Sequence, residues 1–505
     1  MKIFRIFLFC AFMAADMMTA TGCSPEKTHD FSDVFLDEDE NVQTGGKVQP
    51  PHEVKARKNK TSAWSTYQAY TVDRLKNAAG EVFDPQAAEE PQKDKYGGWK
   101  VMNRAATGFF RTEKIGDRWW LITPEGNIYL SNGVAVFAIG NSERQKANLI
   151  QKFGSDYNWA KQETGKLRSL GFNSLGAWSS VGLVKGLPEP MPYTVIVSPM
   201  SKLNGYLKSN GEEAAGFAAA GWEGYPYDFA MIFHPKFDEY VESELAKVSA
   251  YANDPYCIGY FIDNEIPWKD YALDKCLGSW PSTHVNHQKA QQWLDQRKGK
   301  TGAKLSEATA EDKKAFIAYC YELYLQKVTT ALRKYDSNHL FLGDRFNQWN
   351  YELKNEKIWE VAGKYLDVIS LNHYQKWQPD ATAMQNWAAW SGKPFMITEF
   401  YTKGEDSELA NTTGAGWNVR TQADRGLFYQ NFVIELVKSK SCVGWHWFTY
   451  RDNDPEDLTT DPSNRDSNKG IVTWDLNYYT PLSDRMHELN VNLYELTRFY
   501  DKKND

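Results

Sequence analysis

The sequence has little cysteine, no long apolar run after its first residues, and no excess of positive charge. Six cysteines in 505 residues, none in a Cys-x-x-Cys pair, do not predict a disulfide framework or a thiolate zinc site. The nine histidines form no recognised ligand pattern, and neither a phosphate-binding glycine loop nor a Gly-x-Ser-x-Gly motif occurs. Acidic residues outnumber basic ones by 65 to 58, which gives a net charge of −7 and no general attraction to nucleic acid. We therefore expect no metal, no cofactor and no nucleic-acid partner.

Aromatic residues, in contrast, are abundant. The chain contains 26 Phe, 28 Tyr and 19 Trp. Rings of this number suit either a large buried core or a protein that stacks them on the flat apolar faces of sugars. Composition alone leaves both interpretations open.

The first residues have the pattern of an export signal. Lys2 and Arg5 precede a short apolar run that ends at Ala20-Thr21-Gly22-Cys23. Small residues before a cysteine resemble a bacterial lipobox, so we expect a lipoprotein signal peptide at 1–23 and lipidation of Cys23. The alternative is an ordinary secretory signal cleaved near Ala20. The expected location is an exported, membrane-anchored lipoprotein, in the periplasm or at the cell surface.

The following segment, 24–60, is expected to form a flexible tether. It combines acidic and basic runs with Gly and Pro pairs and few apolar residues, which cannot offset the entropy lost on ordering. Residues 61–127 then show short strand and turn patterns, which predict a small N-terminal β element that closes one end of the next unit.

From residue 128 to 505, apolar strands alternate with helical patterns. Eight such units are typical of a (β/α)8 TIM barrel, so we expect an α/β catalytic barrel here. An open doubly wound sheet is the alternative, although no phosphate loop follows any strand. The expected strands are 128–136, 172–178, 193–198, 258–264, 340–343, 368–372, 394–398 and 443–448, and the clearest helices are 237–251, 312–335, 422–438 and 482–500.

Two features that could suggest a ligand site have simpler interpretations. The acidic stretch 452–457 lacks the glycine and terminal glutamate of an EF-hand, so we interpret it as a solvated loop. The cysteines after the leader fall in predicted strands and helices, where buried free thiols are expected; they are Cys257, Cys276, Cys320 and Cys442.

Two glutamates lie where a barrel places its chemistry. Glu265 ends the fourth predicted strand and Glu399 ends the seventh, at the face where barrel active sites are built. Paired carboxyl groups of this kind cleave glycosidic bonds, one protonating the leaving oxygen and the other attacking the anomeric carbon. The alternative is that either glutamate only pairs with a cation such as Arg345.

Other strand-end residues could support that chemistry. Asn264 could bind a sugar 2-hydroxyl, and Tyr374 or His373 could hold the carboxylate of Glu399. We expect sugar-stacking walls from Trp178, Trp445 and Trp447, and polar groups that set sugar identity from Asn132, Asp344, Arg345 and His373. A strand-end tryptophan that only covers the core is the alternative interpretation.

Several segments resemble the β-agarases of glycoside hydrolase family 50. They are 105–114 (AATGFFRTEK), 119–127 (WWLITPEGN), 171–179 (GFNSLGAWS), 263–265 (DNE) and 398–400 (TEF). The resemblance covers about 99–500 and implies a retaining clan-A hydrolase, with Glu265 as acid/base and Glu399 as nucleophile. The chain departs from the family pattern because only about 40 residues precede this segment after the tether, where those enzymes usually carry a larger carbohydrate-binding-like domain.

The resulting hypothesis is a lipid-anchored retaining hydrolase of β-galactosidic linkages in agarose or its oligosaccharides. Its expected partner is therefore a poly- or oligosaccharide. The alternatives are a clan-A hydrolase of another β-glycan (porphyran, mannan or glucan) and a glycan-binding surface lipoprotein without turnover.

Overall fold

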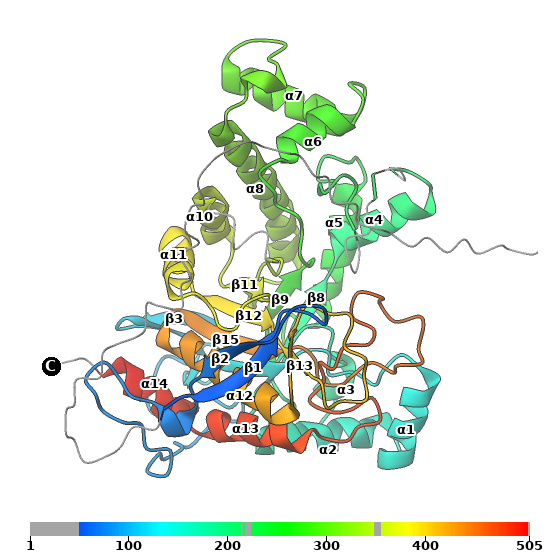
Figure 1. Cartoon of the computed structure of the whole chain (residues 1–505). Helices are drawn as coiled ribbons and strands as arrows, with labels where there is room; N and C mark the ends of the chain where they lie inside the picture. Colours follow the sequence, from blue (N-terminus) through cyan, green and yellow to red (C-terminus); the bar gives the residue numbers. More distant parts are fainter. Residues whose placement is uncertain (1–49, 214–215, 218–223, 348–354, 503–505) are drawn as a thin grey trace, which may run out of the picture. The chain divides into compact units, whose positions relative to one another are not determined.

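The computed structural model shown in Figure 1 describes residues 50–213, 216–217, 224–347 and 355–502. The chain divides into two units, Met1–Lys47 and Val48–Asp505, and only the second contains described residues. The predicted signal peptide with Cys23 and most of the predicted tether lie outside the described residues.

The centre of the second unit is an eight-stranded parallel sheet. Its strands occur in the order β10-β9-β8-β7-β6-β15-β12-β11, so the first strand in the chain, β6, lies beside the last, β15, and β10 and β11 form the two edges. They are β6 (Ser131–Val134), β7 (Ser174–Leu175), β8 (Tyr193–Val197), β9 (Cys257–Ile262), β10 (Leu340–Phe341), β11 (Ile369–Asn372), β12 (Phe395–Glu399) and β15 (Cys442–Trp447). Each lies within or overlaps one of the eight strands expected from the sequence.

The sheet curls until its two edge strands approach each other. Phe346, five residues beyond β10, forms a parallel bridge with Leu371 of β11. Its N–H donates to Ser370 O at 2.9 Å, and its carbonyl accepts from Asn372 N at 2.8 Å. The fold is therefore a mixed α/β fold with a curled parallel sheet, consistent with a TIM-like barrel.

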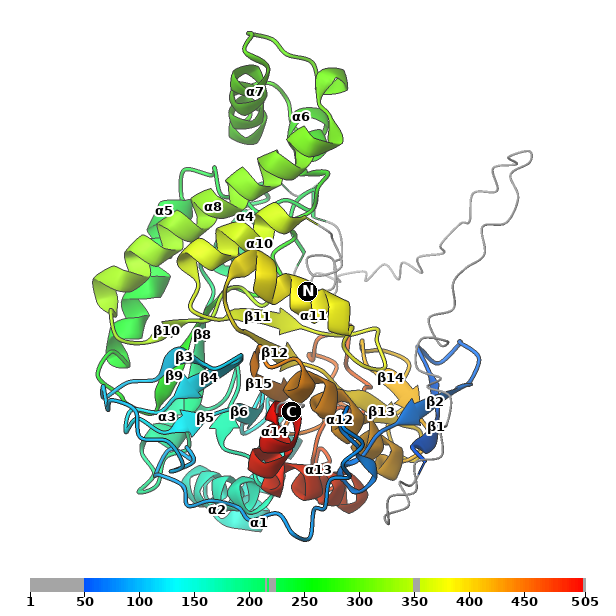
Figure 2. The ribbon, with the colours of Figure 1, turned by 90° about the vertical axis from the view of Figure 1, so that its left-hand side faces the viewer.

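Helices surround the outside of this sheet, as Figure 2 shows. The α-helices are α1 (Glu143–Phe153), α2 (Asp156–Ser169), α3 (Val181–Lys185), α4 (Pro199–Ser209), α5 (Phe237–Leu245), α6 (Ala272–Ser279), α7 (Val285–Lys298), α8 (Ala310–Tyr335), α10 (Glu356–Tyr365), α11 (Ala381–Ser391), α12 (Gln422–Lys438), α13 (Thr480–Val491) and α14 (Leu493–Asp501). Short 3-10 turns occur at Val72–Arg74, Ala246–Ala250 and Leu305–Glu307. Both views place α6 and α7 at the end of α8 that lies away from the sheet.

Local sequence explains where these elements begin and end. The strands β9 and β15 are buried along their whole length, which is why they read as continuous apolar runs in a sheet covered on both faces. Helix α8 begins at the capping box of Thr309 and Asp312, and α12 begins at the equivalent pair Thr421 and Asp424. The expected helix at 482–500 is two helices, α13 and α14, because the chain breaks at Asn492.

The predicted N-terminal β element is present. The strands β3 (Arg111–Ile115), β4 (Arg118–Ile122) and β5 (Ile128–Tyr129) form an antiparallel sheet. Phe110, Leu121 and Tyr129 join one buried cluster with Ile258 and Val443, near the starts of β9 and β15. The element thus covers the amino ends of the parallel strands and leaves their carboxyl ends open to other groups.

The end of the predicted tether is ordered, which corrects the expected boundary at residue 60. His52–Arg57 forms β1, which pairs with β2 (Ser65–Ala69) and with β14 (Trp417–Val419). The fourth strand of this sheet is β13 (Thr402–Gly404). Val54 and Ala56 are fully buried, while Glu53 and Lys55, which alternate with them, are exposed; β1 therefore has an apolar face that its charge-rich composition does not reveal.

Candidate active site

The two predicted glutamates lie at the carboxyl ends of their strands. Glu399 is the last residue of β12, and Glu265 follows the end of β9 by three residues. The N–H of Glu265 donates to Asp344 O at 3.0 Å, which ties this loop to the segment after β10. Glu399 is 5% exposed, whereas Glu265 is partly exposed. The two carboxyl groups therefore have different surroundings.

The carboxylate of Glu399 is held on both oxygens. Arg345 Nη2 donates to Oε1 at 2.7 Å, and the Tyr374 hydroxyl donates to Oε2 at 2.6 Å. Burial raises the pKa of Glu399, and the positive charge of Arg345 and the Tyr374 hydrogen bond oppose that rise. Of the two residues expected to hold Glu399, Tyr374 makes the contact, and the contacts from Tyr374 and Arg345 both favour the ionised carboxylate.

Asn372 links the two glutamates through a chain of hydrogen bonds. Its Nδ2 donates to Glu265 Oε1 at 2.7 Å and to Asn264 Oδ1 at 3.1 Å, and its Oδ1 accepts from Thr398 Oγ1 at 2.8 Å. Arg345 Nε donates to the same Thr398 hydroxyl at 3.3 Å. Asn372 is completely buried, so each of these bonds is made away from water.

Trp178 forms the open side of this network, against the buried Arg345. The Arg345 guanidinium lies 4.2 Å from the centre of the Trp178 ring, and Trp178 is 40% exposed. Arg345 is fully buried, and its Nη1 makes no hydrogen bond with the described residues. The exposed indole offers an apolar face to a ligand, and the buried guanidinium places a positive charge against that indole.

The backbone is strained at the residues that form this site. Trp178, Asp263, Glu265 and Arg345 have φ of 58°, 63°, 53° and 55°, in the left-handed region that non-glycine residues rarely adopt. Such conformations cost of order 1–3 kcal/mol each and are kept only where the surroundings enforce them.

Asp263 shows how the strained conformation is enforced. Its carboxylate accepts from Met200 N at 2.9 Å, Ser201 N at 3.2 Å and the Tyr324 hydroxyl at 3.0 Å. These contacts anchor the start of the loop that carries Glu265.

Lys469 is a site residue that the sequence interpretation missed. It is 3% exposed, and its ammonium lies 5.2 Å from the ring centre of Phe448, which itself contacts Trp178. Burial lowers the pKa of Lys469 to about 8, while the charges of Asp452 and Glu399 oppose that shift. Asn372, the last residue of the expected strand 368–372, is the second such residue, because neither it nor Lys469 lies in a local motif.

Three predicted binding residues instead face the helices. Trp445 Nε1 and Asn132 Oδ1 both bond the hydroxyl of Tyr429 on α12, at 3.3 and 3.1 Å. Trp447 packs on Phe400 and Tyr429 and donates to Lys469 O at 2.8 Å. Because all three are at most 1% exposed, their placement corrects the expectation that they contact a sugar.

His373 and Asp344 are also turned away from the site. The His373 ring packs on Trp387 and Phe432, and burial lowers its pKa to about 3. The Asp344 oxygens accept from Trp268 Nε1 at 2.7 Å and the Tyr321 hydroxyl at 3.0 Å, and burial raises its pKa to about 6. Both residues stabilise the structure behind the site, which corrects their expected role in setting sugar identity.

The features outside the site have structural roles. Asp452 and Asp454 are buried, and Asp452 accepts from the backbone N–H groups of Lys469 and Gly470, so the acidic stretch is not a solvated loop throughout.

The cysteines of the described chain are free and buried, as expected. Within the described ranges, no three or more His, Cys, Asp or Glu side chains gather to hold a metal ion, and no helix there has the length and apolarity needed to span a membrane.

Fold and site together define a class: TIM-like α/β proteins with two carboxyl groups at the carboxyl ends of a parallel sheet. No protein-family model matches the chain. Its sequence is 25% identical to β-agarase B of Vibrio sp. (strain JT0107) over 517 aligned positions, covering 81% of this chain and 51% of that protein. β-Agarase A of the same organism is also 25% identical, over 72% of this chain and 38% of its own length. The chain thus spans about half the length of these curated relatives or less.

Solved structures extend the comparison. The structure of BpGH50 is 29% identical, with a TM-score of 0.74 over 90% of this chain and 96% of that one. The structure of an exo-β-agarase shares the fold, with a TM-score of 0.65 and 22% identity over 81% of this chain and 69% of that one. The chain therefore resembles β-agarases in sequence and BpGH50 in both sequence and fold.

Proposed function

We propose that this protein is a glycoside hydrolase that cleaves β-galactosidic linkages in agarose or agaro-oligosaccharides. The observation that carries the proposal is the pair of glutamates, one buried and held in place, the other partly exposed, joined by Asn372 and Thr398. Similarity to two β-agarases supports agarose as the substrate. The complete closure of a (β/α)8 barrel over 128–505 belongs to the same proposal, as do the signal peptide at 1–23 and a tether between it and β1.

In this mechanism Glu399 is the nucleophile. Its ionised oxygen attacks the anomeric carbon as the glycosidic C–O bond breaks, and a covalent glycosyl-enzyme forms. Arg345 and Tyr374 favour the ionised carboxylate before attack and orient it. Asn264, beside Glu265, is placed to bind a sugar 2-hydroxyl, and Trp178 offers a face for stacking.

Glu265 is the acid/base. Its proton passes to the leaving oxygen in the first step, and its carboxylate then takes a proton from the water that attacks the anomeric carbon and releases Glu399. The stereochemistry is retained, and the two carboxyl groups are expected about 5–5.5 Å apart with substrate bound.

Kinetics with two substrates tests these roles. Glu399→Gln should abolish hydrolysis of agaro-oligosaccharides and of activated aryl galactosides alike. Glu265→Ala should reduce cleavage of the oligosaccharides far more than that of the aryl galactosides, because a good leaving group needs little protonation. NMR should show the β-anomer as the first product; an initial α-anomer, or equal losses on both substrates, would reject the assignment. Faster cleavage of porphyran, mannan or glucan oligosaccharides would reject the agarose claim alone, and binding without turnover would indicate a glycan-binding lipoprotein.

We also propose lipid anchoring through Cys23. The protein should sediment with membranes, and Cys23→Ser should release it or block its processing. Mature protein in the soluble fraction that still begins before residue 23 would contradict the anchor.

A further inference from the structure

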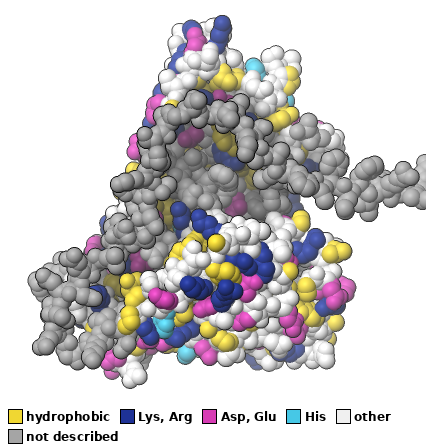
Figure 3. Space-filling model, viewed as in Figure 1, with side chains coloured by type: hydrophobic (Ala, Val, Ile, Leu, Met, Phe, Trp, Pro, Cys, Tyr) yellow, Lys and Arg dark blue, Asp and Glu magenta, His cyan; other side chains and the backbone are white. Residues whose placement is uncertain are grey.

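Cationic side chains gather around one indole on the β1–β2 hairpin. The guanidinium of Arg57 lies 4.5 Å from the Trp64 ring centre, and that of Arg420 lies 3.7 Å from it. Lys58 and Lys60 lie on the same turn of the chain between β1 and Trp64. We call Arg57, Lys58, Lys60, Trp64 and Arg420 the Trp64 cluster; Figure 3 shows Lys and Arg side chains concentrated over this hairpin.

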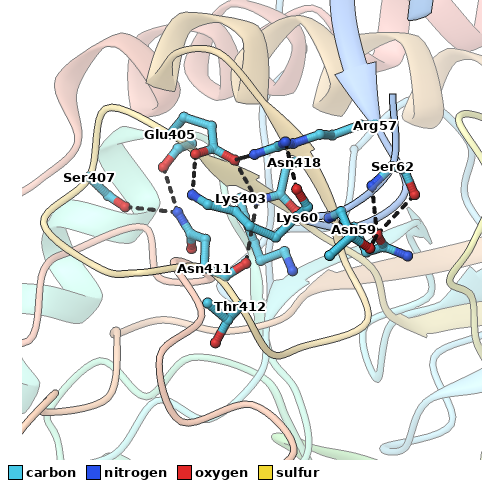
Figure 4. Close-up of polar contacts among 12 residues, drawn as sticks. Arg57, Asn59, Lys60, Ser62, Lys403, Glu405, Ser407, Asn411, Thr412 and Asn418 are labelled. Atoms are coloured by element: carbon cyan, nitrogen blue, oxygen red, sulfur yellow. Dashed lines mark hydrogen bonds and ion pairs between the residues drawn. The ribbon is translucent and has the colours of Figure 1, made fainter. Parts of the chain in front are cut away.

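The charge of the Trp64 cluster is only partly compensated. Arg57 Nη2 donates to Glu405 Oε1 at 2.7 Å, and Lys60 pairs with the other oxygen of the same carboxylate, as drawn in Figure 4. One carboxylate therefore serves two cations. Lys58 and Arg420 are exposed and make no ion pair with any described residue. Such a positive surface is unusual in a chain whose net charge is −7.

Arg420 is prepared to bind an oxyanion. Stacking on Trp64 fixes the plane of its guanidinium, so less side-chain entropy is lost when a ligand binds. The N–H edge of a guanidinium matches two oxygens of a tetrahedral oxyanion, and Lys58, the chain neighbour of Arg57, adds a second exposed positive charge. The donor set thus fits a sulfate group.

A short stretch of chain and one strand pairing connect the active site to the Trp64 cluster. The strand β13 begins three residues after Glu399, and its Gly404 pairs with Val419, the neighbour of Arg420 in the chain. At about 3.6 Å per residue and about 4.8 Å between strands, the Cα atoms of Glu399 and Arg420 lie within roughly 27 Å of each other. A polysaccharide seated at Glu399 can span that distance with a few sugar units.

We propose that the Trp64 cluster binds a sulfate ester on a galactan chain whose neighbouring units occupy the active site. The proposal rests on the galactan-hydrolase function and extends it to anionic substrates. An anionic membrane is a less suitable partner, because polybasic membrane-binding segments present several free cations and here Arg57 and Lys60 are already paired.

Binding to the inactive variant Glu399→Gln of the full chain tests the site without turnover. Isothermal titration should show tighter binding of sulfated agar oligosaccharides than of the same oligosaccharides after desulfation, with the difference shrinking as NaCl rises. Adding Lys58→Glu and Arg420→Glu should weaken binding of the sulfated form about tenfold, the expected size for two exposed charge contacts. The pair Lys161→Glu and Lys289→Glu, an equal charge change at exposed positions on α2 and α7, should leave it unchanged.

Three results would overturn the proposal. They are equal affinity for sulfated and desulfated oligosaccharides, equal loss with the Lys161 and Lys289 control, and a Lys58- and Arg420-dependent binding seen with phosphatidylglycerol vesicles in place of the oligosaccharide. A chain that hydrolyses neutral agarose but shows any of these keeps its proposed function and loses this site. A chain that hydrolyses nothing, yet binds sulfated oligosaccharides through Arg420, keeps the site and loses the function.

Discussion

Removing one hydroxyl from Tyr374 should move the acidic limb of the pH–rate profile. The Tyr374→Phe change deletes the donor that lies 2.6 Å from Glu399 Oε2 and leaves the Arg345 contact to the other oxygen intact. Burial already raises the pKa of Glu399, and the lost hydrogen bond stabilised the ionised form. The pKa of Glu399 should therefore rise further, and the nucleophile should become active only at higher pH.

The size of the shift follows from the geometry. A hydrogen bond to a charged group is worth about 1.5–3 kcal/mol, and about 1.4 kcal/mol corresponds to one pH unit. Because Arg345 stays in place and water can replace part of the lost hydrogen bond, the lower end of this energy range applies. We expect the acidic limb of kcat/KM to move upward by about one pH unit.

The assay is kcat/KM for agaro-oligosaccharides between pH 4 and 9, compared with Tyr401→Phe. Tyr401 is a matched control because it is also buried and contacts the Tyr374 ring, but its hydroxyl bonds Ser467 at 3.2 Å. The control should keep the wild-type limb. An unshifted limb in Tyr374→Phe, or the same shift in both variants, would refute the role of Tyr374.

Three further changes test other parts of the site. Burial raises the pKa of Asp344 from its ordinary 3.8 to about 6, so its stabilising contribution is complete below the ordinary value and is lost as pH rises through about 6. The free energy of unfolding, measured by thermal denaturation, should therefore fall by up to about 3 kcal/mol between pH 4 and 7. Asp344→Asn should flatten that dependence, and an unchanged slope would contradict the role of Asp344. Asn372→Leu removes three hydrogen bonds, two of them to the buried Asn264 and Thr398, so urea unfolding should show a loss of roughly 2–4 kcal/mol together with a lower kcat, and a loss under about 1 kcal/mol would mean that these bonds matter little. Trp178→Ala should raise KM for oligosaccharides roughly tenfold while Trp178→Phe restores most of it, whereas equal effects would exclude stacking.

The strands and the two glutamates could be predicted because their signals are local. An apolar run that ends in a polar residue marks a buried parallel strand, and both Glu265 and Glu399 follow such runs. Helix α12 was predicted with its observed bounds because its capping box precedes an apolar pattern of helical period.

The orientation of Trp445 and Trp447 could have been predicted from the alternation of side chains along their strand. Side chains alternate along a strand, and His446 between them bonds Ser131 Oγ at 3.0 Å within the sheet. The two tryptophans must then face the helices. Strand ends identify the right region of a barrel, but alternation decides which side chains point into it.

Asn372 and Lys469 depend on contacts between distant parts of the chain. Asn372 reaches Glu265, 107 residues away, and Lys469 comes near Glu399 only because the segment after β15 folds back on Asp452. No periodicity or short motif encodes such a contact, and nothing local distinguishes these residues from other polar side chains.

The pairing of β1 with β14 has a consequence for synthesis. Ala56 of β1 pairs with Val419 of β14, 363 residues later, so β1 is synthesised long before its partner strand. At about 5–20 residues per second the ribosome needs roughly 20–70 s to supply the partner. During that time the outer edge of the β1–β2 hairpin has unpaired backbone groups, a template for association with other chains. The charges of the lysines and the arginine that flank this edge oppose such association of the nascent chain, before any substrate is present.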